Sequence, residues 1–481
     1  MKMVKTLLLG SAAGLVAIAG AQAADLPVKA KPVEYVKVCS LYGAGFYYIP
    51  GTDTCVKIGG YVRGQYYYGN GSQVSQGVMF GATNGEQSRR GGDDAVLRTR
   101  AVMTMDSRTQ TEWGTLRTYY LLGFTDDNGT NTLYATRGFI QFAGFTFGKA
   151  QSFYDIFSNP AVSYFGFASS DTGDAGTNLA AYTAQLGNGV SATISAEAPR
   201  RTGIFNDGAA ATAVTLGANL NNDYVNVRWP DVVGAIRVDQ AWGSFQVMGA
   251  LHDASAAYNF AGGVPITTAG NGDDAIGFAV GVGARIKTDF ISRGDSFQFQ
   301  VNYTEGALKY AVTTQPTAGS ALRYSGDSIG TGWFTDGVAV NGGGVDLVKV
   351  FGVNASYEHV WTPALKTSVY GAYINVDYGD AGNTAMCNYF RNTSTTINLT
   401  AASACDMDFA FWQLGSRTQW NVRPDFYMGV DVLYTSLDSA LKGSTATSIA
   451  GVGAQAARAG NVFGDQDALA VTFRVHRDIV P

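Results

Sequence analysis

Long segments in which apolar and polar residues strictly alternate limit the possible folds of this chain more than any other feature. In SFQFQVNYT, residues 296–304, aromatic and aliphatic residues occupy alternate positions, and Gln, Asn and Thr fill the positions between them. The stretches DFYMGVDVLY (425–434) and ALAVTFRVHRD (468–478) repeat this pattern. Because successive side chains of a strand point to opposite faces, each segment predicts a strand with one apolar and one polar face.

Sixteen such segments follow one another from Cys55 to the C-terminus, and their connections alternate between long and short. Short turns are predicted at GNG (187–189), AWG (241–243), WTP (361–363) and VRP (422–424). This arrangement is typical of an up-and-down antiparallel sheet, which can close on itself and so remove its edges. The predicted strands are 55–68, 95–107, 112–124, 132–143, 145–151, 178–186, 189–197, 231–240, 243–254, 274–288, 294–304, 345–360, 364–378, 408–421, 425–437 and 465–478.

Composition and hydropathy favour a membrane barrel over a soluble one. The chain has 61 Gly, 26 Tyr and 26 Phe but only 15% charged residues, which favours strands and turns over helices. A soluble barrel of this size would expose an apolar surface far larger than a monomer tolerates, whereas lipid covers the same surface in an outer membrane. We therefore predict an all-β fold over residues 55–481, a 16-stranded antiparallel transmembrane β-barrel with short periplasmic turns and long extracellular loops.

The N-terminus has the features of a secretory signal peptide. Lys2 and Lys5 precede an apolar run, and the small-residue pattern Ala21-Gln22-Ala23 follows it, which predicts cleavage of residues 1–23 after Ala23. Residues 24–54 would then form a periplasmic segment. Removal of the two lysines leaves 31 basic and 38 acidic residues, a net charge near −7, which argues against nucleic acid as a partner.

The four cysteines form two local pairs in a chain predicted to enter an oxidising compartment. Cys39 lies close to Cys55 in the sequence, and Cys387 lies close to Cys405. Neither pair has the CxxC spacing of a zinc site, so two short-range disulfides are expected.

Catalytic and metal-binding patterns are nearly absent from the sequence. The three histidines, His252, His359 and His476, lie on different predicted strands without ligand spacing around them. One GxSxG match, residues 326–330, lies within a long Gly/Ser/Thr loop, whereas a nucleophile elbow requires a strand before it and a helix after it. We therefore expect no catalytic residue, no metal and no cofactor.

The segment 152–177 differs from the other predicted connections. It is aromatic and apolar enough to pack against something, carries Asp155, Asp171 and Asp174, and contains no basic residue. One interpretation is a surface loop with a weak calcium contact at DTGD. The other is a loop that folds into the barrel and narrows it.

Several motifs together resemble one family. The stretch VCSLYGAGFYYIPGTDTCVKIGGYVRGQYYYG (38–69) closely resembles the start of the alphaproteobacterial trimeric general porins of the rhizobial and Brucella type, and AVLRTRA, TEWGTLRTYY, SFYD, VGAIRVDQAWGS and DALAVTFRVHRD do likewise. The resemblance implies a homotrimeric outer-membrane channel in which small hydrophilic solutes and ions diffuse passively, with the third long loop folded inward. The terminal RDIVP departs from the aromatic residue that usually ends outer-membrane barrels.

Strand parity predicts the lining of this channel. A barrel of sixteen strands is too wide for its side chains to fill, so water would occupy it. The inward face of the first four strands carries the basic residues Lys57, Arg63, Arg98, Arg100, Arg117 and Arg137. If Asp155, Asp171 and Asp174 faced this basic wall, a transverse field would cross the opening.

Two functions remain open at this point. A general porin would admit solutes by size, with outer-membrane lipid and lipopolysaccharide around a homotrimer. The alternative is a substrate-selective channel for sugars or small peptides. An enzyme barrel would need a Ser/His/Asp group on its rim, and no plausible trio is visible.

Overall fold

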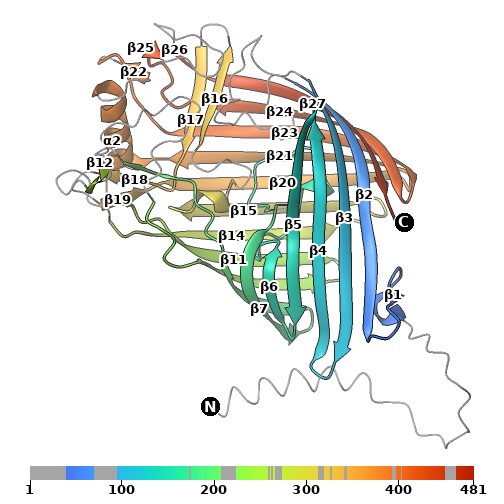
Figure 1. The fold of residues 1–481 in the computed structure, drawn as a ribbon. Helices are drawn as coiled ribbons and strands as arrows, with labels where there is room; N and C mark the ends of the chain where they lie inside the picture. Colours follow the sequence, from blue (N-terminus) through green and yellow to red (C-terminus); the bar gives the residue numbers. More distant parts are fainter. Residues whose placement is uncertain are drawn as a thin grey trace, which may run out of the picture.

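A closed antiparallel β-barrel forms the body of the protein in the computed structural model (Figure 1). The structure describes residues 39–69, 95–172, 175–206, 224–257, 260–261, 264–265, 273–312, 319–325, 328–340, 344–392, 397–401, 403–449 and 462–480. Within these ranges sixteen strands make the barrel, and the predicted fold class is confirmed. They are β2 (Thr54–Gly69), β3 (Ala95–Thr111), β4 (Gly114–Asp127), β5 (Thr130–Phe142), β6 (Phe145–Ala150), β7 (Thr177–Gly187), β8 (Val190–Glu197), β10 (Asp231–Gln240), β11 (Gly243–Asp253), β14 (Ile276–Lys287), β15 (Ser296–Glu305), β20 (Lys349–Thr362), β21 (Leu365–Asp377), β23 (Phe409–Arg423), β24 (Phe426–Asp438) and β27 (Gln466–Asp478).

The barrel closes where its first strand meets its last. Strand β2 pairs with β3 on one side and with β27 on the other, in antiparallel register that matches Tyr61 with Asp478 and Gly69 with Ala470. We call this β2–β27 junction the seam. Closure supplies partners for the backbone groups of both edge strands, as a barrel in lipid requires.

The alternation read from the sequence corresponds to the two faces of the wall. On β23 the side chains of Leu414 and Trp420 point outward and are 53% and 50% exposed, whereas Gln413 and Arg417 point inward and are each 2% exposed. Among the residues that the structure describes, no helix is long and apolar enough to cross a bilayer.

Two-residue turns join many strands on the periplasmic side, and their backbone explains their sequences. Ala143-Gly144 and Asn188-Gly189 both have positive φ at the two central positions. Such turns match the twist of the flanking strands and favour Asn-Gly. At the opposite end of β4, the predicted strands 112–124 and 132–143 left residues 125–131 as a connection, but β4 and β5 continue to a two-residue turn at Asn128-Gly129, with φ of 49° and 90°.

The N-terminal segment is tied to the barrel at its periplasmic end. Residues Cys39–Tyr42 form the short helix η1, and β1 (Tyr47–Tyr48) pairs with the start of β2. The disulfide between Cys39 and Cys55 joins this segment to β2, as predicted. The predicted signal peptide and its cleavage site lie outside the described residues.

At the opposite end of the barrel, the long loops carry small elements that pack on one another (Figure 1). They include the single-turn helix η3 (Leu308–Tyr310) and the longer helix α2 (Gly379–Asn392), whereas the single-turn helix η2 (Asn159–Ala161) belongs to the loop between β6 and β7. The loop strands are β9 (Ile204–Asn206), β12 (Phe260–Ala261), β13 (Val264–Pro265), β16 (Gly319–Ser325), β17 (Ser328–Phe334), β18 (Gly337–Val340), β19 (Gly344–Leu347), β22 (Ile397–Leu399), β25 (Ala446–Ile449) and β26 (Val462–Phe463).

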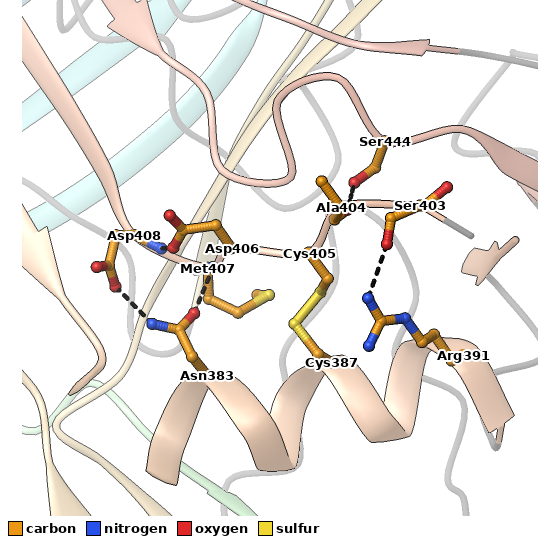
Figure 2. The surroundings of a disulfide bond; sticks show 10 residues. All are labelled: Asn383, Cys387, Arg391, Ser403, Ala404, Cys405, Asp406, Met407, Asp408 and Ser444. Atoms are coloured by element: carbon orange, nitrogen blue, oxygen red, sulfur yellow. Dashed lines mark hydrogen bonds between the residues drawn. A yellow bond between two sulfur atoms is a disulfide. The ribbon is translucent and has the colours of Figure 1, made fainter. Parts of the chain in front are cut away.

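The second disulfide holds α2 in this loop layer. Cys387 of α2 is bonded to Cys405, which confirms the predicted pairing. Figure 2 shows Asn383 one turn before Cys387, where its side chain accepts a hydrogen bond from Met407 N at 2.6 Å and donates one to Asp408 at 3.0 Å. One face of α2 is therefore fastened to the segment that leads into β23.

Substitution of an outward residue tests the assignment of the two faces. Val247 lies on the outward face of β11 and is 49% exposed. We expect Val247→Arg to lower the free energy of unfolding by about 2–4 kcal/mol, because a guanidinium near the bilayer midplane loses its hydration. Urea titration in lipid vesicles measures this change.

Two variants serve as controls for this experiment. Val247→Leu keeps the outward side chain apolar, and Thr193→Arg adds the same charge to the lumenal face of β8. Both should unfold near the wild-type urea midpoint. Equal destabilisation by Val247→Arg and Thr193→Arg would show that Val247 does not face lipid.

Candidate functional site

The loop between β6 and β7, of which residues 151–172 and 175–176 are described, lies inside the barrel against the wall that runs from β11 to β27. Six lumenal side chains from five strands, β11, β15, β21, β23 and β27, hydrogen-bond to it. The contacts are Gln246 Nε2 to Phe153 O (3.0 Å), Gln300 Nε2 to Ser170 Oγ (2.5 Å), Ser368 Oγ to Val162 O (2.5 Å), Ala168 N to Gln413 Oε1 (2.8 Å), Arg417 Nη1 to Ala161 O (3.0 Å) and Arg474 Nη2 to Tyr164 O (3.0 Å). We call the described residues 151–172 and 175–176 the inner loop. It spans the interior from β11 to β27.

A buried carboxylate on β24 holds the tip of the inner loop. Asp431 accepts hydrogen bonds from Ser163 Oγ (3.0 Å) and from Tyr164 N (2.5 Å). The hydroxyl of Tyr370 on β21 donates to the same carboxylate at 2.6 Å. Arg417 is the direct cross-strand neighbour of Asp431, so the carboxylate is compensated by hydrogen bonds and by a nearby positive charge.

The acidic residues predicted on the inner loop stabilise the loop itself. Asp155 accepts hydrogen bonds from Thr172 N (2.7 Å) and Thr172 Oγ1 (2.5 Å), and one of its oxygens lies 3.5 Å from Arg200 Nη2. Asp171 accepts a hydrogen bond from Asn159 N at 2.7 Å. Burial raises the pKa of the Asp155 carboxyl above its usual range, although Arg200 acts in the opposite direction. Asp174 lies outside the described residues.

Arg200, which sequence reasoning did not select, thus supplies the positive charge beside Asp155. It follows β8 in the sequence, is 6% exposed, and also donates from Nη1 to Ser170 O at 3.1 Å. Its guanidinium lies 4.3 Å from the ring centroid of Tyr310. Asp155 of the inner loop therefore faces Arg200 instead of the basic wall of β2–β5.

Two of the six predicted basic residues have carboxylate partners on the same wall. Arg98 forms a bidentate pair with Asp127, at 2.5 and 2.6 Å. Arg117 shares Asp106 with Arg108, and each of these guanidinium groups has a nitrogen 2.9 Å from an Asp106 oxygen. These pairs fix the orientation of the guanidinium groups along the wall.

The other predicted basic residues occupy different heights in the barrel. Lys57 is near the periplasmic end, where its Nζ donates to Ala44 O at 3.1 Å. Arg63 lies six residues further along β2, about 20 Å away in an extended strand, and is directly opposite Arg100 on β3. The six residues therefore form a wall along the strands and not a single ring.

Arg137 lies at the base of the inner loop. A Cβ atom at Gly176, which has a φ of +61°, would approach Arg137 Nη1 to 2.6 Å. A glycine at this position lets the chain leave the inner loop and enter β7 beside the Arg137 guanidinium.

Two further lumenal arginines, Arg417 and Arg474, were missed as site residues. The guanidinium of Arg474 on β27 lies 4.1 Å from the ring centroid of Tyr164, and that of Arg417 lies 5.4 Å from the same ring. The alternation in ALAVTFRVHRD placed Arg474 on a polar face. It contained no signal that the inner loop would reach that strand.

Exposure differs between the two sides of the lumen. Inward side chains of β15, β20, β21 and β23 are mostly buried beneath the inner loop and the other long loops. On β3–β5, by contrast, many inward side chains are only half-buried, including Arg98, Arg100, Tyr119 and Tyr134. Water therefore reaches the lumenal face of β3–β5 far more than the opposite wall.

The three histidines have separate structural partners. His252 Nδ1 lies 2.7 Å from Asp231, His359 Nδ1 lies 2.8 Å from Asp295, and His476 Nε2 lies 3.1 Å from Asp478. In the described part of the chain, no group of three or more His, Cys, Asp and Glu side chains is arranged to hold a metal ion. The GxSxG stretch lies partly outside the described residues, and its serine, Ser328, begins the loop strand β17.

Comparison with known proteins relates this geometry to a family. The family model described as the porin subfamily matches residues 25–469. Porin Omp2b of Brucella canis is 36% identical over 259 residues, and porin Omp2b of Brucella suis is 36% identical over 265 residues. Each match covers 50% of this chain and 64% of the relative, so the chain spans just under two thirds of the length of these relatives.

A solved structure supports the same architecture. The outer-membrane channel DcaP of Acinetobacter baumannii superposes with a TM-score of 0.59 at 15% sequence identity, and the match covers 90% of this chain and 99% of that one. At this identity the likeness concerns the fold alone. With the family model matching nearly the whole sequence and the strands closing into a 16-stranded barrel, the chain belongs to the porin subfamily and is an outer-membrane protein.

Proposed function

We propose that this protein is a general porin, a water-filled channel through which small hydrophilic solutes and ions diffuse passively. The observation that supports the proposal is that the inner loop covers one side of the barrel's inner wall and leaves the other side exposed. The inner loop occupies the far wall, whereas half-buried polar side chains remain in contact with water along β3–β5. A diffusion channel requires such a wall in contact with water.

The proposed constriction lies between the inner loop and the lumenal wall of β2–β5. On that wall the described residues include seven basic side chains, Lys57, Arg63, Arg98, Arg100, Arg108, Arg117 and Arg137, and two acidic ones, Asp106 and Asp127. The inner loop adds Asp155 and Asp171, of which Asp155 is paired with Arg200. The positive charge on the wall therefore exceeds the negative charge, which supports a preference for anions.

This preference is expected although the whole chain carries a net charge of −5. Screening limits the field of a charge to about 8–10 Å at physiological salt, so an ion in the pore responds to the lining and not to distant surface carboxylates. In this proposal the wall of β2–β5 carries an excess of positive potential, whereas the sequence-based hypothesis required Asp155, Asp171 and Asp174 to face that wall.

A substrate-selective channel is the second candidate, and one observation favours it. Arg98, Arg100 and Arg117 lie 5.3–5.4 Å from the ring centroids of Tyr67, Tyr134 and Tyr119, respectively, so guanidinium groups and aromatic rings are ordered along one wall. Liposome swelling with sugars and peptides of graded size separates the two functions. A general porin ranks them by size, and a selective channel saturates with one class.

We further propose that the protein acts as a homotrimer surrounded by outer-membrane lipid and lipopolysaccharide. The outward faces of the seam strands expose Val62, Tyr66 and Phe473, a surface suited to apolar contacts with lipid or with another copy. Native mass spectrometry of the detergent-extracted protein should give the mass of three chains, and a single-chain mass would refute the trimer.

Loss of the carboxylate that holds the inner loop should widen the channel. In Asp431→Asn, the bonds from Ser163, Tyr164 and Tyr370 lose their charged acceptor, and each such bond contributes about 1.5–3 kcal/mol. We expect higher single-channel conductance and more open-channel noise in planar bilayers. The control is Asp239→Asn, which removes a lumenal carboxylate paired with Arg237, away from the inner loop. Equal conductance in wild type and Asp431→Asn would contradict this role.

Neutralisation of the wall should change ion selectivity. The double variant Arg98→Gln/Arg100→Gln removes two of the seven basic side chains and leaves Asp127 without its bidentate partner. We expect the reversal potential in a KCl gradient to shift toward cation preference. Arg293→Gln, in the periplasmic turn between β14 and β15, changes the same charge outside the lumen and should leave the reversal potential unchanged. An unchanged potential in the double variant would exclude this wall as the selectivity determinant.

A further inference from the structure

Four polar side chains meet across the seam beside the tip of the inner loop. Arg63 and Gln65 on β2 are the direct cross-strand partners of His476 and Arg474 on β27. All four point into the lumen, and their exposed fractions are 7%, 4%, 9% and 4% in the order Arg63, Gln65, His476, Arg474. We call these four residues the seam cluster.

Each member of the seam cluster has a buried polar atom without a hydrogen-bond partner among the described residues. These atoms are Arg63 Nε, Gln65 Nε2 and Oε1, Arg474 Nε and His476 Nδ1. A buried donor that lacks a partner destabilises a protein, and it does so more strongly if it is charged. The four side chains are direct cross-strand neighbours, so a single ligand at the seam would supply partners to all of them.

The positive charge of the cluster indicates that the ligand is an anion. Within the described residues, neither Arg63 nor Arg474 forms a salt bridge with a carboxylate, and their positive charges repel one another. The acidic groups nearby do not pair with either arginine: Asp478 lies 3.1 Å from Nε2 of His476, the histidine of the cluster, and Asp431 accepts the inner-loop hydrogen bonds. Two buried guanidinium groups at such close range require a counter-charge.

Aromatic rings enclose the cluster and limit what can enter it. The ring of Tyr427 stacks on His476 with centroids 4.6 Å apart, and Tyr164 of the inner loop stacks on Tyr427 at 6.2 Å. The Arg474 guanidinium lies against the Tyr164 ring at 4.1 Å, and its Nη2 donates to the Tyr164 carbonyl. The inner-loop tip therefore covers the cluster from the lumenal side.

We propose that the seam cluster binds a small tetrahedral oxyanion of the phosphate type. Guanidinium groups match the geometry of phosphate oxygens, and donors from two strands approach from several directions, which suits an ion with four oxygens better than a carboxylate with two. The bound ion offsets the repulsion between Arg63 and Arg474 and bridges the seam to the inner loop. This inference rests on the proposed channel, since the ion would occupy the lumenal wall beside the constriction.

The test combines binding with conduction in the full-length purified protein. Isothermal titration calorimetry with inorganic phosphate at pH 7 should show one saturable site per chain. In planar bilayers, phosphate added at constant ionic strength should lower the single-channel chloride conductance with the same half-saturating concentration. Acetate, a carboxylate probe, should have a much weaker effect.

Variants locate the effect at the seam. Arg63→Gln and Arg474→Gln should each weaken phosphate block about tenfold or more, as expected for loss of a charged hydrogen-bond donor. The matched control is Arg285→Gln, which removes a lumenal arginine of β14 away from the seam and should leave the half-blocking concentration unchanged. Arg63→Lys retains the charge and should bind phosphate with intermediate affinity.

The outcomes separate this proposal from the channel itself. If wild-type channels conduct ions but do not respond to phosphate, the proposed phosphate site is wrong and the proposed channel function is still supported. Equal weakening by Arg63→Gln and Arg285→Gln would also overturn it, because the block would then reflect general lumenal charge. If a seam variant fails to fold, or if no conductance is detected, calorimetry on the wild-type protein tests the site by itself. One saturable phosphate site per chain supports the proposal, and no phosphate binding overturns it.

Discussion

The closed ladder of backbone hydrogen bonds is the constraint on which the rest of this structure depends. In hydrocarbon an unpaired amide or carbonyl has no water to bond, so a sheet can cross a membrane only as a barrel without edges. Here the pairing of β2 with β27 meets that requirement. Closure also fixes the direction of every side chain, because each strand then has one face toward lipid and one toward the lumen.

Closure creates a second problem, since a barrel of this size contains many polar inward side chains. On one side of the lumen, backbone groups of the inner loop form hydrogen bonds with Gln246, Gln413 and Arg417. Without the loop these side chains would face water. Asp431 holds the loop tip by accepting from its backbone and its serine. The opposite wall keeps its contact with water, so one loop decides both where the lumen is filled and where it remains open.

The loop layer also determines which charges act on the lumen. Asp155 lies on the inner loop, but its partner is Arg200 from the connection after β8. Arg98 and Arg117 lie on the wall with Asp127 and Asp106 beside them. Local pairing thus reduces the effect of several charges that strand parity alone would count as equal. The remaining excess of arginine distinguishes the wall of β2–β5.

The sequence by itself determined the strands, their faces and the closed sheet. Alternation is a local property of extended backbone, and a shift of one residue would move every apolar side chain from lipid to water. Both disulfides were predictable because their cysteines are near neighbours along the chain. Asn-Gly at 128–129 is a typical sequence for a two-residue turn, but the predicted strands left a longer connection at 125–131.

Only the tertiary structure decided the partners of the lumenal residues. Tyr164 and Asp431 are separated by 267 positions, and nothing in either segment specifies the other. Their contact depends on the circumference of the closed barrel and on the path of the inner loop across it. For the same reason Arg200, Arg417 and Arg474 could be placed on polar segments but not beside the inner loop, because contacts across a lumen leave no periodic trace in the sequence.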